Sequence, residues 1–253
     1  MLTKPTVVIP DENSYERVSF KSFSDIIEYL THMTTLDEGR HIIHYLFQGM
    51  YDLLGTVSNS EVHYLYKKVV RTGTKYYASY YRGEGDISII KALLPYLGVL
   101  TQYNDNYYYK IRGNFDYGSS IMQPDIARFL QGAINSSFNY DVIVGIATSA
   151  SEPAMALAGL LNLPLEFVRY SKRRSDGSVT VLDFMAEEIR TECVAKNALV
   201  IDDWVASGNS MQRCMKYVQG LGALQVRGAT IEDNGNDMDI KTIESTQNFK
   251  LYE

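Results

Sequence analysis

The sequence predicts an α/β domain with a mostly parallel sheet flanked by helices, preceded by a mainly helical N-terminal lobe. From residue 140 onward, apolar runs such as VIVGIA (142–147), LEFVRY (165–170) and NALVID (197–202) alternate with stretches of helical pattern. Continuous apolar runs are typical of strands buried on both faces, and their alternation with helices indicates parallel βαβ units. Before residue 84 the apolar residues recur at helical spacing. We therefore expect a lobe of unassigned role over residues 1–84 and an α/β domain over residues 85–253.

Within the lobe, helical periodicity predicts three helices, over Ser24 to Met33, Asp37 to Leu54 and Ser60 to Val70. The tyrosine-rich segment from Gly73 to Gly85 predicts a strand or hairpin that ends in a glycine-rich turn. A short helix over Asp86 to Leu97 and a strand over Asn106 to Arg112 follow. The next helix, from Gln123 to Ile134, has Pro124 in its first turn, where the missing N–H costs nothing.

The α/β part then continues as strand, helix and strand in turn. After VIVGIA a helix extends through Leu161, and beyond LEFVRY the run SVTVLDF (178–184) is expected to be a strand. NALVID is followed by a helix from Met211 to Val218 and by the strand ALQVRGATI (223–231). Because open α/β sheets bind ligands at the carboxyl ends of their strands, functional residues are expected after these runs.

Composition narrows the class of protein. The chain of 253 residues is 45% hydrophobic and 21% charged, as in an ordinary globular protein, and its net charge of −6 argues against general nucleic-acid binding. Two cysteines, Cys193 and Cys214, are too few for a disulfide framework. The opening residues lack a long apolar leader and no later stretch would span a bilayer, so we expect a cytoplasmic protein with no membrane contact.

Tyrosine is the one unusual component, with 20 residues in the chain, many of them bunched at 76–81 and 103–109. Tyrosine rings stack on nucleobases, but they are also common in half-buried strands and interfaces, and the structural role is the more frequent one.

The segment NALVIDDWVASGNS (197–210) carries the clearest chemical signal. An apolar strand ends in Asp202 and Asp203 and passes through a loop of small residues into a helix. Backbone N–H groups and hydroxyls at a helix N-terminus bind phosphate, and Gly208 allows close approach of the backbone. The two carboxylates suit ribose hydroxyls and a Mg²⁺ shell. A plain helix-capping loop is the alternative, but two acids against a buried strand are costly without a partner.

These residues resemble the PRPP (5-phosphoribosyl 1-diphosphate) signature of the type I phosphoribosyltransferases, an apolar strand, two acids, two variable residues and a loop of the form ATGGT. Here the loop is Ala206, Ser207, Gly208, Asn209 and Ser210. The resemblance extends over roughly residues 86–235 and is closest to the orotate branch. It implies the type I phosphoribosyltransferase core, with PRPP bound by this loop and with Asp202 and Asp203 as catalytic acids that contact Mg²⁺ through water or PRPP.

Two further segments resemble the family's ligand loops. Residues 144–156 resemble the pyrophosphate loop, which implies PRPP contacts from Thr148, Ser149, Ala150 and Ser151, although the family's Gly-Gly pair is replaced here. Residues 167–177 resemble the strand that leads into the mobile catalytic loop. This implies Lys172 and Arg173 as catalytic cations and Arg169 and Arg174 as PRPP contacts, whereas the orotate branch's His-Gly is missing. A closing basic loop would neutralise the leaving pyrophosphate.

By the same resemblance, Tyr107, Tyr108 and Glu232 would form the pocket for a small nitrogen-base acceptor. No arginine follows Gly228, where orotate enzymes carry one for the substrate carboxylate, so orotate is not expected to be the acceptor. The implied protein is a Mg²⁺-dependent, homodimeric glycosyltransferase of nucleotide metabolism that releases pyrophosphate. Two alternatives stay open: a PRPP- or nucleotide-sensing regulator with the same fold, and an accessory protein that interacts through residues 1–84.

Overall fold

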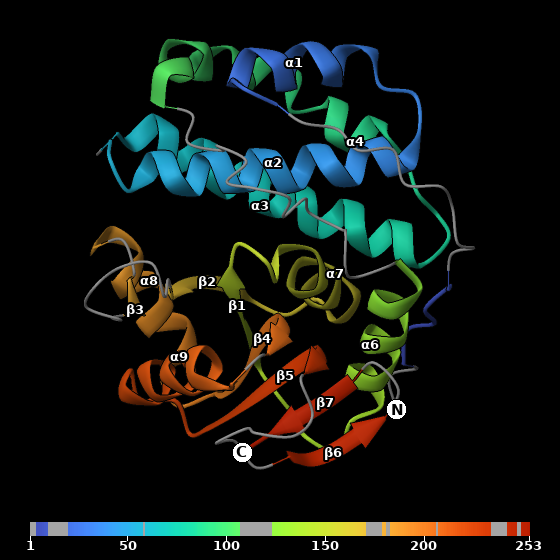
Figure 1. Cartoon of the computed structure of the whole chain (residues 1–253), viewed down its shortest axis with the longest axis vertical. Coiled ribbons are helices and arrows are strands. Elements are labelled where there is room, and N and C mark those ends of the chain that lie inside the picture. Colours follow the sequence, from blue (N-terminus) through green and yellow to red (C-terminus); the bar gives the residue numbers. More distant parts are fainter. Residues whose placement is uncertain are drawn as a thin grey trace.

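The computed structural model describes residues 4–9, 20–57, 59–106, 123–170, 179–180, 183–205, 207–233, 242–246 and 249–253. Two layers are visible in Figure 1, a helical layer formed by the first part of the chain and a seven-stranded sheet with its own helices below it. None of the described helices is long and apolar enough to cross a membrane.

The helical layer consists of six elements with clear local causes. Side chains of Ser22 and Asn59 cap α1 and α3, and Thr35 forms a capping box with Glu38 at the start of α2. Pro95 lies in the first turn of α5 and separates it from α4, so the helix expected over Asp86 to Leu97 is two short pieces. The elements are α1 (Phe23–His32), α2 (Leu36–Leu54), α3 (Ser60–Tyr81), α4 (Ser88–Lys91), α5 (Leu94–Leu97) and the 3-10 helix η1 (Gly98–Asn106).

The strand or hairpin expected over Gly73 to Gly85 is wrong, because α3 continues to Tyr81. The tyrosine hydroxyls explain why this segment is helical. Tyr76 and Tyr77 donate to backbone carbonyls of α2, and Tyr80 and Tyr81 donate to the carboxylates of Asp37 and Glu152. Tertiary packing on α2 and α7 thus overrides the strand preference of tyrosine, and this cluster is structural.

The sheet has the order β3-β2-β1-β4-β5-β7-β6. β1, β2, β4 and β5 are parallel, whereas β3 and β7 pair antiparallel with β2 and β5, and β6 with β7. The strands are β1 (Val142–Ala147), β2 (Leu165–Tyr170), β3 (Val179–Thr180), β4 (Asn197–Val205), β5 (Gln225–Asp233), β6 (Thr242–Thr246) and β7 (Phe249–Tyr252). The predicted fold class, an α/β core with a mostly parallel sheet behind a helical N-terminal region, is confirmed.

The helices of this part are α6 (Gln123–Asn135), α7 (Ser151–Leu161), α8 (Asp183–Cys193) and α9 (Asn209–Gly220). The strand expected over residues 178–184 is wrong at its end, because only Val179 and Thr180 pair with β2 and α8 begins at Asp183. The strand expected over Asn106 to Arg112 lies almost entirely outside the described residues. β6 and β7 were not predicted, since β6 is mostly polar and β7 has only four residues.

One hydrophobic core joins the helical layer to the sheet. The ring of Phe47 on α2 lies 4.5 Å from that of Phe167 on β2, measured between centroids. Helices α3 and α7 approach so closely that a Cβ on Gly159 would lie 2.3 Å from the carbonyl oxygen of Thr74. Figure 1 shows α7 between α3 and the strands. The helical layer therefore packs directly on α7, the helix that follows β1.

Candidate functional site

The acids of β4 occupy the carboxyl end of the parallel sheet, beside the end of β1. Asp202 is 7% exposed and its carboxylate accepts hydrogen bonds from the Ser149 hydroxyl at 2.8 Å and from the Asp203 N–H at 3.0 Å. The carboxylate of Asp203 accepts from the Trp204 N–H at 2.8 Å. Parallel pairing of β1 with β4 places Ser149 next to Asp202. The structure thus brings two predicted segments, far apart in sequence, into one site.

Burial raises the pKa of both acids. For Asp202 the pKa is raised first by burial and then by the neighbouring Asp203 charge, while the Ser149 hydrogen bond opposes the shift. The pKa of Asp203 is also raised by burial, against hydrogen bonds that lower it. Two adjacent carboxylates held in this way favour a bound cation or a hydroxyl donor, either of which would relieve the cost of their negative charge.

A cavity of about 140 Å³ lies next to these acids, at the start of α9. It is lined by Asp202 and Trp204 and by the loop residues Ser207, Gly208, Asn209 and Ser210. Gly208 has φ +80°, a conformation in which a side chain is strained, and it gives α9 no side-chain cap. The Gln212 N–H donates to the Gly208 carbonyl at 2.8 Å, whereas the N–H groups of Asn209, Ser210 and Met211 have no backbone acceptor among the described residues. They are therefore available, with the helix dipole, to a phosphate.

The loop between β1 and α7 contacts Asp202 through Ser149 and the helical layer through Thr148 and Ser151. Thr148 donates a hydrogen bond to the Gln48 side chain at 3.2 Å, and the Ser151 hydroxyl lies 2.9 Å from Nδ1 of His44. Burial lowers the pKa of His44 to about 3, so its imidazole is neutral at physiological pH. Of the four residues predicted here, Ser149 contacts Asp202, Thr148 and Ser151 contact α2, and Ala150 is the N-cap residue of α7.

These contacts belong to a stripe of four residues along α2 that sequence reasoning did not assign to the site, Arg40, His44, Gln48 and Asp52. Their spacing of four residues puts all of them on one face of the helix. In the same order they contact Glu152, Ser151, Thr148 and Arg169. The available signal was this polar spacing of four inside a helix whose other positions are largely apolar. We call these residues the α2 stripe.

Arg169 lies at the end of β2, as predicted, but its guanidinium forms an ion pair with Asp52 of the α2 stripe. It also lies over the ring of Tyr51, 5.8 Å from the centroid. Its side chain is 32% exposed, so it keeps a face open to solvent. A ligand phosphate at this position would compete with the Asp52 carboxylate.

Glu232 lies at the carboxyl end of β5, paired in register with Trp204 of β4. Burial, and then the charges of Asp125 on α6 and of Asp203, raise its pKa. It therefore belongs to the same acidic edge of the sheet, and Asp125 is an acid of this edge that sequence reasoning missed. The other predicted site residues, Tyr107, Tyr108, Lys172, Arg173, Arg174 and Ala206, lie outside the described residues.

Comparison with known proteins assigns a family to part of the chain. The family model described as phosphoribosyl transferase domain matches residues 119–244. No curated protein matches the sequence. Solved structures resemble part of the chain at low identity and with TM-scores below 0.5.

Three such structures illustrate the likeness. A purine phosphoribosyltransferase from Pyrococcus horikoshii is 19% identical, with 43% of this chain and 70% of that chain covered and a TM-score of 0.33. An orotate phosphoribosyltransferase from Aeropyrum pernix is 21% identical, with 45% and 59% covered and a TM-score of 0.35. An adenine phosphoribosyltransferase from Thermoanaerobacter pseudethanolicus is 16% identical, with 45% and 74% covered and a TM-score of 0.35.

Proposed function

The chain belongs to the type I phosphoribosyltransferases through its domain at residues 119–244, and on this premise we propose that it transfers ribose 5-phosphate from PRPP to a small nitrogen base. In this reaction the bond from C1 of the ribose to the pyrophosphate oxygen breaks, and a bond from C1 to a ring nitrogen forms. The single observation that carries the proposal is the acid pair of buried Asp202 and half-buried Asp203, with Asp202 lining the cavity at the start of α9. The two acids and the phosphate-binding loop together would bind one sugar phosphate.

Each part of the site has a proposed role. Asp202 and Asp203 accept hydrogen bonds from the ribose hydroxyls and stabilise the positive charge that develops at C1. The loop from Ser207 to Ser210 binds the 5′-phosphate through N–H groups and hydroxyls. Thr148, Ser149, Ala150 and Ser151 border the pyrophosphate, and Arg169 and Arg174 contact PRPP. Lys172 and Arg173 belong to a lid that neutralises the leaving group.

A magnesium ion coordinated jointly by the protein and by PRPP would fit this site. The described residues contain no group of three or more metal-ligating side chains. Mg²⁺ is commonly held by one or two carboxylates together with substrate phosphates and water, and Asp202 and Asp203 supply such a pair, whose raised pKa a cation would lower. When bound, the ion would neutralise the charge of the pyrophosphate. Ser149 would keep the Asp202 carboxylate oriented.

The acceptor is proposed to be a neutral or amino-bearing ring rather than orotate. Glu232 and Asp125 make the edge of the sheet acidic, and like charges repel a substrate carboxylate. Carboxylates accept hydrogen bonds from ring N–H and amino groups. Tyr107 and Tyr108 would stack on the ring.

The α2 stripe favours a second candidate function, a PRPP- or nucleotide-sensing regulator. Asp52 already pairs with Arg169, Gln48 accepts from Thr148 and His44 contacts Ser151, so the helical layer touches three of the proposed PRPP contacts. A ligand that displaces these contacts would change the interactions that hold α2 against the sheet. Such a protein would bind PRPP without releasing pyrophosphate.

Calorimetry with PRPP·Mg²⁺ tests the site directly. We expect the double variant Asp202→Asn, Asp203→Asn to bind at least about tenfold more weakly, or ~1.4 kcal/mol, while remaining folded. The charge-matched control Glu84→Gln, Asp86→Asn changes two exposed acids outside the site and should bind as the unmodified chain does. Unchanged affinity in a folded Asp202, Asp203 double variant would refute the proposed site.

Pyrophosphate release across a panel of acceptors tests the reaction. Adenine, other purines, uracil and orotate are each supplied with PRPP·Mg²⁺. Release with one of the neutral bases, well above that with orotate, is the expected result. Binding of PRPP without release for any acceptor would replace the enzyme by the sensor, and efficient release with orotate would show that the acceptor assignment is wrong.

A further inference from the structure

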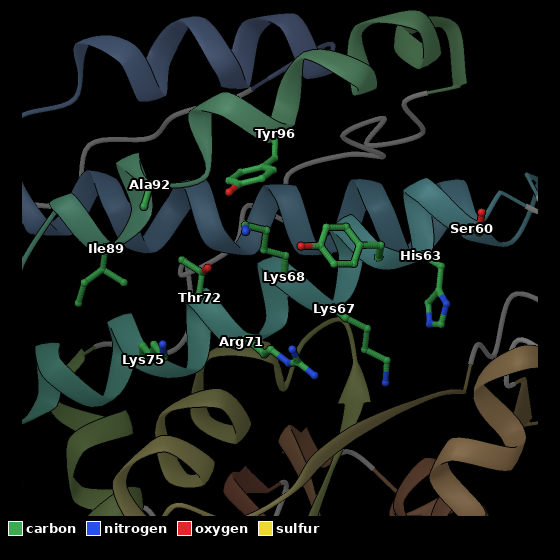
Figure 2. Close-up of a pocket in the computed structure, with 11 residues that line it drawn as sticks. Ser60, His63, Lys67, Lys68, Arg71, Thr72, Lys75, Ile89, Ala92 and Tyr96 are labelled. Carbon is green, nitrogen blue, oxygen red and sulfur yellow. The ribbon is translucent and has the colours of Figure 1, made fainter.

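Helix α3 carries four basic residues, Lys67, Lys68, Arg71 and Lys75, on the side that borders a groove of about 720 Å³. The spacing from Lys67 through Arg71 to Lys75 is four residues each, so these three form a row about 12 Å long. Figure 2 shows the groove between α3 and the α4–α5 region, with Tyr96, Ile89 and Ala92 on the opposite wall. We call this feature the α3 groove. It concentrates positive charge in a chain whose net charge is −6.

Most of this positive charge is not neutralised. Lys67 is paired, with Nζ 2.7 Å from Glu188 and 3.4 Å from Glu166. Arg71 and Lys75 are exposed, and their side chains make no ion pair or hydrogen bond within the part of the chain that the structure describes. The remaining cation, Lys68, lies over the rings of Tyr96 and Tyr64 at 3.5 and 5.9 Å from the centroids.

The row of cations is accessible from two sides. Lys67, Arg71 and Lys75 also border a second hollow of about 620 Å³, between α3 and the start of β2. In Figure 2, Lys67 and Arg71 extend from α3 toward the sheet, whereas Lys68 extends toward Tyr96. The acids that border the second hollow are Glu166, which is paired with Lys67, and Glu192, which lies 2.9 Å from Lys196. Several phosphates can therefore contact the row at once.

We propose that the α3 groove binds a nucleotide carrying two or more phosphates. Arg71 and Lys75 would pair with separate phosphates, because their positions lie about 6 Å apart along the helix. The exposed ring of Tyr64, with 62% of its surface accessible, offers a face for a base, while Ile89 and Ala92 provide an apolar wall. The volume is that of a small-molecule site.

A nucleic-acid strand fits these observations less well. A polymer needs a charged track that continues past one site, whereas the row ends at Lys75, after about 12 Å. The next basic residue, Arg82 at the C-cap of α3, also borders the second hollow, but it lies two turns further on and its guanidinium donates to the carbonyls of Gly159 and Leu160 at 3.4 Å. The overall negative charge of the chain also disfavours binding a long polyanion.

This site is separate from the proposed PRPP site. The α3 groove and the cavity at the start of α9 have no lining residue in common. Nucleotide binding in the α3 groove therefore does not depend on the proposed transferase activity, and either proposal can fail without the other.

Calorimetry on the full chain at low salt tests the proposal, with ATP, adenosine and inorganic tripolyphosphate as probes. We expect ATP and tripolyphosphate to bind and adenosine not to bind detectably. Arg71→Gln with Lys75→Gln should weaken ATP binding at least tenfold. The matched control Arg190→Gln with Lys216→Gln removes two exposed cations elsewhere and should stay within twofold. Ser207→Ala with Ser210→Ala, in the proposed phosphate loop, should also leave this ATP binding unchanged.

A separate variant tests the proposed stacking on Tyr64. Tyr64→Leu keeps an apolar side chain but removes the stacking face, so it should weaken ATP several-fold and leave tripolyphosphate unaffected. Three results would overturn the proposal. These are unchanged ATP affinity in the Arg71, Lys75 variant, an equal loss in the matched control, and tighter binding of a 15-residue oligouridine RNA than of ATP.

Discussion

Glu152, at the start of α7, is fully buried and is held by charge-assisted contacts with the helical layer. Its carboxylate accepts from Nε and Nη2 of Arg40 at 2.7 and 2.9 Å and from the Tyr81 hydroxyl at 2.7 Å. Removing one partner of a buried pair leaves the other charge uncompensated. Glu152→Gln should therefore lower the free energy of unfolding by about 3–5 kcal/mol, measured by urea denaturation.

The exposed pair on α8 supplies the control for this prediction. Glu187 has a side chain that is 79% exposed and lies 3.9 Å from Arg190. Since exposed ion pairs contribute little, Glu187→Gln should change the free energy of unfolding by less than about 1 kcal/mol. Equal effects of the two substitutions would contradict the special role of the Arg40–Glu152 pair.

Glu166 on β2 gives a prediction about pH. Burial, opposed by Lys67, raises its pKa from 4.5 to about 7. Between pH 4.5 and about pH 7, the Glu166 carboxyl is therefore protonated in the folded state and ionised in the unfolded chain. The free energy of unfolding falls as pH rises through this window. Above pH 7 the ionised Glu166 costs about 3 kcal/mol relative to pH values below 4.5.

The neutral variant Glu166→Gln isolates this effect. Its stability should match that of the unmodified chain near pH 4.5 and exceed it increasingly up to about pH 7. Urea denaturation of both proteins at pH 5 and pH 8 makes the comparison, in which the titrations of buried His41 and His44 cancel. A stability difference that is the same at both pH values would show that Glu166 ionises normally.

At the scale of elements, α2 is the helix that connects the helical layer to the proposed PRPP site. The Asp52 carboxylate at its end pairs with Arg169 and would compete with pyrophosphate for this guanidinium. Asp52→Asn should therefore tighten the binding of pyrophosphate or PRPP by about three- to fivefold, which matches the energy of a partly exposed ion pair. Calorimetric titration of Asp52→Asn and of the unmodified chain with pyrophosphate or PRPP measures the change in affinity.

Glu28→Gln, at an exposed position of α1, removes the same charge at a position outside the α2 stripe and should leave the affinity unchanged. Weaker binding by Asp52→Asn would mean that Asp52 orients Arg169 for the ligand. No change would remove Arg169 from the proposed PRPP contacts.

At the scale of the whole molecule, the helical layer and the sheet share one core. Residues 85–253 alone would leave Glu152 without Arg40 and would expose the surface of α7 that packs on α3 at Gly159. We expect this fragment to be unfolded or aggregated, because a buried charge would be left unpaired next to a large apolar surface. Circular dichroism and urea denaturation of the separately expressed fragment measure its folding.

Co-expression of residues 1–84 should rescue the fragment, since both halves of the shared core would then be present. The intact chain should unfold in a single transition by fluorescence and by circular dichroism. A fragment that unfolds cooperatively with nearly the stability of the full chain would mean that the two parts are independent. The predicted division at residue 84 would then mark a boundary in folding as well as in sequence.

Local pattern was sufficient for much of the fold. The apolar runs at residues 142–147, 165–170 and 197–202 predicted strands because strands buried on both faces have no polar alternation. Periodicity likewise predicted α1 and α2, and Pro124 in the first turn was consistent with the start of α6. The segment from Asp202 to Ser210 could be assigned because its strand, acids and loop are contiguous, so that no long-range contact is needed to assemble it.

Tertiary structure decided what depends on contacts between distant segments. Tyr76 to Tyr81 favour a strand by local preference, yet they are helical because their hydroxyls find partners on α2 and α7. The pairing of Ser149 with Asp202, and of Arg169 with Asp52, follows from the order of strands and from the packing of α2. The row of cations in the α3 groove was visible only once the segment after Val70 proved helical. The sequence alone thus determined the fold class and the contiguous strand, acids and loop that we propose to bind phosphate, which are local features. The folded chain decided which polar groups meet, because burial forces each to find a partner.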